Sequence, residues 1–137
     1  MAGLLTVLGK KMKFLLTLFL MFFTLEAFGE GHTLKESPYK QVQQNIGKGK
    51  PCFLEIGAES CHSCKVMGSR LYTITQKHPE YNIHFINVQK EREVASRLGI
   101  MMIPTQIIYD KEGKEVYRHM GLLSEEELRK LFITYLF

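Results

Sequence analysis

Residues 53–65, FLEIGAESCHSCK, carry the most informative pattern in this 137-residue chain. A short apolar run is followed by Cys61 and Cys64, with two residues between them, at the start of a segment with helical periodicity. This spacing puts both sulfur atoms on one helix turn, where they can bridge with little movement of the backbone. Thiolates at this spacing also suit Cu(I) or zinc, so the four residues alone leave redox chemistry and metal binding open.

The segments around this stretch alternate between strand and helix patterns. Strands are predicted at 52–57, 81–88, 105–109 and 115–119, and helices at 39–46, 61–77, 91–98 and from 124 onward. Ser124 and Glu127 have the spacing of a capping box. The first two strands alternate with helices and should be parallel, whereas the last two flank a turn and should form an antiparallel hairpin. We expect one α/β domain with a mixed sheet between helices.

The first 29 residues have the pattern of a secretory signal peptide. Three lysines, at 10, 11 and 13, precede or flank the apolar run 12–23, and small residues follow at 27 and 29. The run is shorter than the roughly 20 apolar residues that span a bilayer. We expect cleavage after Gly29 and a domain of residues 30–137 in the periplasm or an otherwise exported compartment. An uncleaved membrane anchor is the alternative.

The net charge gives no indication of a nucleic-acid partner. Removing residues 1–29 takes away three lysines and one glutamate, which lowers the formal net charge from +4 to +2. Because the remaining chain has no cluster of lysine and arginine, we expect no nucleic-acid binding. The odd cysteine, Cys52, lies in an apolar strand-like run and is expected to be a buried small hydrophobic residue.

The two cysteines of the pair are predicted to have different roles. Cys61 is expected at the N-terminus of a helix, where the helix dipole favours the thiolate, so it is the candidate nucleophile. Cys64, one turn further on, is the candidate resolving thiol. His62 would stabilise the Cys61 thiolate when protonated and make the pair more oxidising. An exposed loop histidine with little effect is the alternative for His62.

The stretch 53–65 resembles the active-site segment of the thioredoxin superfamily. Ile103-Pro104-Thr105, about 40 residues after Cys64, resembles the cis-proline loop of that family, and residues 121–124 resemble the end of its sheet and the start of its last helix. The resemblance covers residues 38–136. It implies a three-layer thioredoxin-like fold, an enzyme that exchanges thiols and disulfides, and a redox-active Cys61–Cys64 disulfide with no metal and no cofactor.

The resemblance also assigns roles outside the cysteine pair. Pro104 is expected beside the cysteines, with the backbone of Ile103 offered to an extended substrate. Glu55 lies six residues before Cys61, where thioredoxins carry a buried acid, and is expected to accept the proton of Cys64. A solvent-facing glutamate is the alternative, because strand alternation does not decide which way Glu55 points.

Three departures argue against a general cytoplasmic thioredoxin. Ser60 stands where the family usually has tryptophan, His62-Ser63 replaces the usual Gly-Pro, and Phe85 falls where thioredoxins often carry a lysine. We therefore expect an exported, monomeric reductase of protein disulfides, with apocytochromes among its candidate substrates and a membrane protein as its electron donor. A disulfide oxidase or isomerase, a thiolate metal chaperone and a redox-inactive binding module are the alternatives.

Overall fold

The computed structural model describes Gly9 and residues 32–137. The chain divides into two units, Met1–Gly31 and His32–Phe137. The predicted signal peptide of residues 1–29, with its cleavage site, lies outside the described residues apart from Gly9. In the part of the chain that is described, no helix has the length and apolar character needed to cross a membrane.

A four-stranded sheet in the order β2-β1-β3-β4 forms the centre of the unit. The strands are β1 (Cys52–Gly57), β2 (Ile83–Asn87), β3 (Thr105–Tyr109) and β4 (Glu115–Met120). β1 runs parallel to β2 and antiparallel to β3, and β3 and β4 form an antiparallel hairpin. The predicted parallel pair, the hairpin and the mixed sheet are therefore confirmed.

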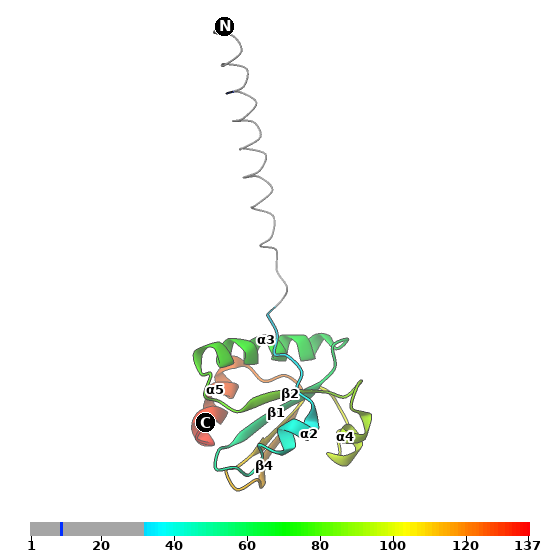
Figure 1. Ribbon diagram of the computed structural model, residues 1–137, viewed down its shortest axis with the longest axis vertical. Coiled ribbons are helices and arrows are strands. Elements are labelled where there is room, and N and C mark those ends of the chain that lie inside the picture. Colours follow the sequence, from blue (N-terminus) through cyan, green and yellow to red (C-terminus); the bar gives the residue numbers. More distant parts are fainter. Residues whose placement is uncertain (1–8, 10–31) are drawn as a thin grey trace. The chain divides into compact units, whose positions relative to one another are not determined.

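Four helices cover the sheet, two on each face (Figure 1). They are α2 (Tyr39–Gln43), α3 (His62–Lys77), α4 (Arg92–Arg97) and α5 (Glu125–Thr134). Side chains of α3 and α5 join one hydrophobic cluster, and those of α2 and α4 join another. The predicted three-layer α/β architecture is confirmed. α5 begins at Ser124 with the predicted capping box.

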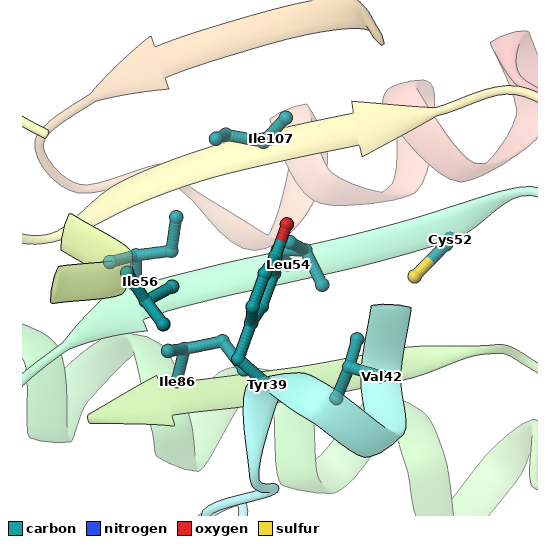
Figure 2. Close-up of a cluster of buried hydrophobic side chains, with 8 residues drawn as sticks. Tyr39, Val42, Cys52, Leu54, Ile56, Ile86 and Ile107 are labelled. Carbon is teal, nitrogen blue, oxygen red and sulfur yellow. The ribbon is translucent and has the colours of Figure 1, made fainter. Parts of the chain in front are cut away.

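Strand alternation sends neighbouring residues of β1 to opposite faces. Phe53 packs with Met67 and Leu71 of α3, whereas Leu54 packs with Tyr39 of α2. Figure 2 shows the second cluster, with Tyr39 and Val42 of α2 turned toward β1 and β2. Because both faces of β1 are covered, all six of its residues are buried.

Several predicted elements are shorter in the structure: α3 and α4 differ from the predicted bounds by one residue at one or both ends, and α2 and β2 differ by more. α2 ends at Gln43 rather than at residue 46, because the chain continues in tighter turns toward Gly47, which has a φ of +73°. β2 begins at Ile83 rather than at residue 81, because the backbone N–H of Tyr81 donates to His78 in the turn after α3. One contact was not predicted: Glu36 forms a parallel bridge with Phe85 at the outer edge of β2.

Candidate active site

Cys61 and Cys64 form a disulfide at the N-terminus of α3. Cys61 is the N-cap residue, and its Sγ accepts a hydrogen bond from the backbone N–H of Cys64 at 3.2 Å. The two Cα atoms are 5.2 Å apart, within the usual range for a disulfide. Cys61 is half-buried, whereas the side chain of Cys64 is only 4% exposed. The sulfur of Cys61 is therefore the more accessible of the two.

Gly57, the last residue of β1, makes room for Cys64. A Cβ atom at Gly57 would lie 2.9 Å from Cys64 Sγ and 3.0 Å from Cys64 Cβ, which is closer than such atoms approach in proteins. Only glycine therefore lets α3 bring its inner sulfur down to the end of the strand. Gly57 was not among the predicted site residues; the signal for it is a glycine that ends an apolar strand four residues before the first cysteine.

The loop that carries the chain from β1 to Cys61 is tied to the segment after β2. The N–H of Val88 donates to the Gly57 carbonyl at 2.9 Å, and the Gln89 amide donates to Ser60 Oγ at 2.8 Å. Lys90 Nζ lies 3.5 Å from a carboxylate oxygen of Glu59. These contacts hold the loop from the side opposite to the cis-proline segment.

Glu55 lies two residues before Gly57, on the same face of β1, and is completely buried. Its Oε2 accepts a hydrogen bond of 3.0 Å from Nε2 of Gln106, its cross-strand partner in β3. Burial raises the pKa of the Glu55 carboxyl to about 8, and the hydrogen bond from Gln106 opposes this shift. The solvent-facing alternative for Glu55 is therefore wrong, because β1 is covered on both faces.

Gln106 was not predicted from the sequence as a site residue. The sequence feature that could have indicated Gln106 is a single long polar side chain in the strand-like run TQIIY, at a position where the alternation of a strand predicts a core residue. Phe85 lies across from Glu55 on the other neighbouring strand, β2. Glu55 is thus flanked in the sheet by an amide and an aromatic ring, and neither of these is a cation.

The peptide bond between Ile103 and Pro104 is cis. Thr105 pairs with Ile56 in the sheet, so Pro104 follows next to Gly57, beneath the disulfide. The Thr105 hydroxyl donates to the Met102 carbonyl at 2.6 Å, and the Gly121 N–H donates to the Pro104 carbonyl at 2.8 Å. The loop is therefore held from both sides, and Ile103 is half-buried in it.

The remaining predicted residues separate into two groups. His62 is exposed directly after Cys61, and the neighbouring Ser63 places its Oγ 3.4 Å from Cys61 Sγ. Cys52 lies at the other end of β1, on the opposite face and fully buried, where burial raises the pKa of its thiol to about 12. Figure 2 shows its sulfur among the apolar side chains near Val42. Cys52 is therefore a core residue.

No three histidine, cysteine or acidic side chains gather as a candidate metal site in the described residues.

The family model of the thioredoxin-like domain matches residues 38–135. The chain belongs to this family.

Individual thioredoxins are similar over most of the same region. A thioredoxin of Alicyclobacillus acidocaldarius is 32% identical over 87 residues, which are 63% of this chain and 82% of the relative. A thioredoxin of Chlamydia muridarum is 34% identical over 79 residues, which are 58% and 76% of the two chains. The solved structure of Fasciola hepatica thioredoxin has a TM-score of 0.61 at 24% identity, covering 71% of this chain and 89% of that one.

Together, the thioredoxin fold and the Cys61–Cys64 disulfide make this protein a thiol–disulfide oxidoreductase. Thioredoxin-like proteins act on protein disulfides, and the cysteine pair at the start of α3 is the group that fits this chemistry.

Proposed function

We propose that this protein is an exported reductase of protein disulfides, with Cys61 as nucleophile and Cys64 as resolving thiol. The observation that carries the proposal is the asymmetry of the pair: Cys61 caps the 16-residue helix α3 and is half-exposed, whereas Cys64 is buried above Gly57. A capping sulfur at a helix N-terminus is favoured as a thiolate by the helix dipole and by the backbone N–H that it accepts.

The first step of the reaction is an attack on the substrate. The Cys61 thiolate attacks one sulfur of a substrate disulfide, forming a mixed disulfide, while the other substrate sulfur leaves as a thiolate and takes a proton from solvent. The protonated His62 imidazole and the Ser63 hydroxyl would both favour the Cys61 thiolate, since one supplies positive charge and the other a hydrogen-bond donor.

The second step releases the reduced substrate. Cys64 loses its proton, through water, to the Glu55 carboxylate and attacks the Cys61 sulfur, which closes the Cys61–Cys64 disulfide and expels the second substrate thiolate. That thiolate takes a proton from solvent, and Glu55 returns its own proton to solvent. Two electrons and, overall, two protons are thus transferred to the substrate. A carboxyl whose pKa lies at about 8 exchanges a proton readily near the working pH, which suits Glu55 for this role.

The surface beside the pair is suited to extended, apolar substrate segments. In this proposal the backbone of Ile103 pairs with a substrate strand, which the cis bond to Pro104 supports. Exposed apolar side chains flank this loop from two sides: Met101, Met102, Met120 and Leu122. Methionine side chains adapt to differently shaped partners, which suits an enzyme that acts on several proteins.

The finer parts of the proposal rest on the sequence. The apolar run 12–23 with its flanking lysines is typical of a signal peptide, so we place the domain in the periplasm or another exported compartment. An exported reductase needs continual reduction in an oxidising compartment, so its donor is proposed to be a membrane protein. Apocytochromes are the proposed candidate substrates, and the working form is a monomer.

Reduction of insulin by dithiothreitol tests the activity. The wild-type domain should accelerate insulin precipitation, and Cys61→Ser should reduce the rate to that of dithiothreitol alone. Cys52→Ala is the matched control, since its buried thiol lies at the far end of β1, and it should retain the wild-type rate. Equal rates for the wild type and Cys61→Ser would overturn the enzyme assignment of Cys61.

The direction of electron flow needs a second measurement. Equilibration of the purified domain with glutathione gives its reduction potential, and a reductase is expected to have a potential near that of thioredoxin, about −270 mV. A value near that of a strongly oxidising disulfide oxidase, about −120 mV, would favour the oxidase alternative instead.

A further inference from the structure

Glu55 and Gln106 form a fully buried polar pair inside the face of the sheet that α3 and α5 cover. Both side chains are 0% exposed. Gln106 has two N–H donors on Nε2, and both are used: one reaches Glu55 Oε2 at 3.0 Å and the other reaches the Gly121 carbonyl at 3.1 Å. Gly121 in turn donates to the Pro104 carbonyl. A short chain of hydrogen bonds therefore connects Glu55 to the cis-proline loop.

The two remaining oxygen atoms of the pair lack donors. Among the residues that the structure describes, neither Glu55 Oε1 nor Gln106 Oε1 has a hydrogen-bond partner. Buried polar atoms are costly when unpaired, and an ionised Glu55 would add a buried charge to two such acceptors. A proton on the Glu55 carboxyl removes this charge. Burial therefore favours the protonated carboxyl, whereas the N–H donor of Gln106 favours the carboxylate.

The other groups that face Glu55 are limited in number. Phe85 lies beside it on β2, and His119 of β4 lies next to Gln106 in the same row across the sheet. Cys64 faces this surface from α3, where it is in disulfide form. His119 is therefore the other ionisable side chain in this row of the described sheet.

We propose that Gln106 is a positioning residue that sets the proton affinity of Glu55. The hydrogen bond from Gln106 Nε2 to Glu55 Oε2 favours the carboxylate form of Glu55. The second hydrogen bond, from Gln106 Nε2 to the Gly121 carbonyl, fixes the amide so that its N–H group rather than its oxygen faces Glu55 Oε2. Without this donor, burial alone would hold the proton on Glu55 to a higher pH. The transfer of a proton from Cys64 to Glu55 rests on the proposed function, whereas the proton affinity of Glu55 does not.

The experiment measures the Glu55 carboxyl directly, by ¹³C NMR titration of the oxidised protein. Neither cysteine of the pair titrates in that form. Replacing Gln106→Met keeps the side-chain length and removes the donor, and should raise the Glu55 midpoint by about one to two pH units, the size expected for one hydrogen bond to a charged group. Gln43→Met, at an exposed position of α2, is the matched control and should leave the midpoint unchanged.

Two further arms separate Gln106 from its neighbours. A His119→Gln background removes the other ionisable side chain of this row, and the shift caused by Gln106→Met should persist there. In the wild type, the side-chain N–H resonances of Gln106 should move with the Glu55 midpoint, and in Glu55→Gln they should not move. This last measurement needs no change at Gln106, so it decides the proposal even if Gln106→Met does not fold.

An unchanged or lowered Glu55 midpoint in Gln106→Met, or Gln106 resonances that ignore the titration, would overturn the proposal. The pH dependence of insulin reduction is measured beside the NMR. A raised NMR midpoint with an unchanged rate profile would support the role of Gln106 and count against Glu55 as the proton acceptor of the proposed function. The two failures are thereby distinguished.

Discussion

The two faces of the central sheet are built from the same strands but carry different side chains. On the face covered by α2 and α4, β1 contributes Cys52, Leu54 and Ile56 to an apolar cluster. On the face covered by α3 and α5, the apolar contribution of β1 is Phe53, after which come Glu55 and Gly57. The residues of β1 on the first face are all part of the apolar core. On the second face, β1 changes within four residues from the core residue Phe53 to the residues beside the disulfide.

This difference shows how the fold separates stability from reactivity. The disulfide needs a glycine beneath it and, in the proposed mechanism, a carboxyl near it, and both features weaken packing. They lie at the end of β1, on one face only, so the opposite face continues to stabilise the strand. Changes on the apolar face should therefore affect stability alone, whereas changes on the other face should affect both stability and the chemistry of the cysteine pair.

The largest effect is expected from Leu54→Ala, which breaks the apolar face. Leu54 is fully buried, and its truncation should lower the free energy of unfolding by about 2–5 kcal/mol, a large part of the 5–15 kcal/mol typical of a domain. Urea denaturation measures the loss. The reduction potential of the folded variant should stay close to that of the wild type; a large change in potential would contradict the separation of the two faces.

The next effect concerns Glu55 and depends on pH. The pKa of Glu55 in the folded protein is about 8, against 4.5 for an ordinary glutamate. At pH values between 4.5 and 8, Glu55 therefore keeps a proton in the native state that it releases in the unfolded chain. The stability that the neutral carboxyl permits is complete below pH 4.5 and is lost as the pH rises toward 8. Glu55→Gln has no such loss, and above pH 8 it should be more stable than the wild type by up to about 5 kcal/mol.

Urea denaturation of the oxidised protein at several pH values checks this expectation through the difference between wild type and variant. Glu59→Gln, an exposed position in the following loop, is the control and should show no growing difference. A difference between wild type and Glu55→Gln that stays constant from pH 4 to pH 9 would mean that Glu55 does not titrate in this range. Insulin reduction by Glu55→Gln should also be slower than by the wild type.

A smaller effect is expected from Gly57→Ala. The added Cβ would lie 2.9 Å from Cys64 Sγ, so the strand end or the helix must move, at a cost of about 1–3 kcal/mol. Gly68→Ala in α3 is the matched control, because its Cβ would meet other atoms only at 3.6 Å and beyond, and alanine favours a helix interior. Thermal unfolding should show a lower Tm for Gly57→Ala and an equal or higher Tm for Gly68→Ala. The opposite order would contradict a close approach at Gly57.

The smallest effect is expected from Ser63→Ala. The Ser63 hydroxyl lies 3.4 Å from Cys61 Sγ and can donate to the thiolate of the reduced protein. Its loss should raise the pKa of the Cys61 thiol by about half to one pH unit, with little change in stability. Ultraviolet absorbance of the thiolate during a pH titration measures the shift. An unchanged titration would exclude the hydroxyl as a donor to Cys61.

The sequence predicted the architecture well because the local signals agreed with one another. Alternation of strand and helix patterns, the turn before β4 and the capping box at Ser124 each gave the observed element. β1 and β3 were predicted with the bounds that the structure shows, since their apolar runs end at clear turn residues. The end of α2 was less accurate, because tight turns beyond Gln43 share the helical pattern.

The site was predictable where a residue acts through its own chemistry. The spacing of the two cysteines and the proline before an apolar strand were enough to predict Cys61, Cys64 and Pro104 as site residues from the sequence. Gly57 and Gln106 were missed, because each acts through what lies next to it: a sulfur from α3 above the glycine, and a carboxyl from β1 beside the amide. Their partners are distant in the sequence or become adjacent only after folding.

The chain by itself thus determined the thioredoxin-like architecture and the reactive cysteine pair, because periodicity, turn chemistry and residue type are local properties. Only the tertiary structure decided the environment of the pair. It fixed that Glu55 points inward rather than to solvent, that burial holds its pKa near 8, and that Gln106 supplies its hydrogen-bond donor. Burial and hydrogen bonding across strands depend on which faces are covered, and that is settled when helices pack on both sides of the sheet.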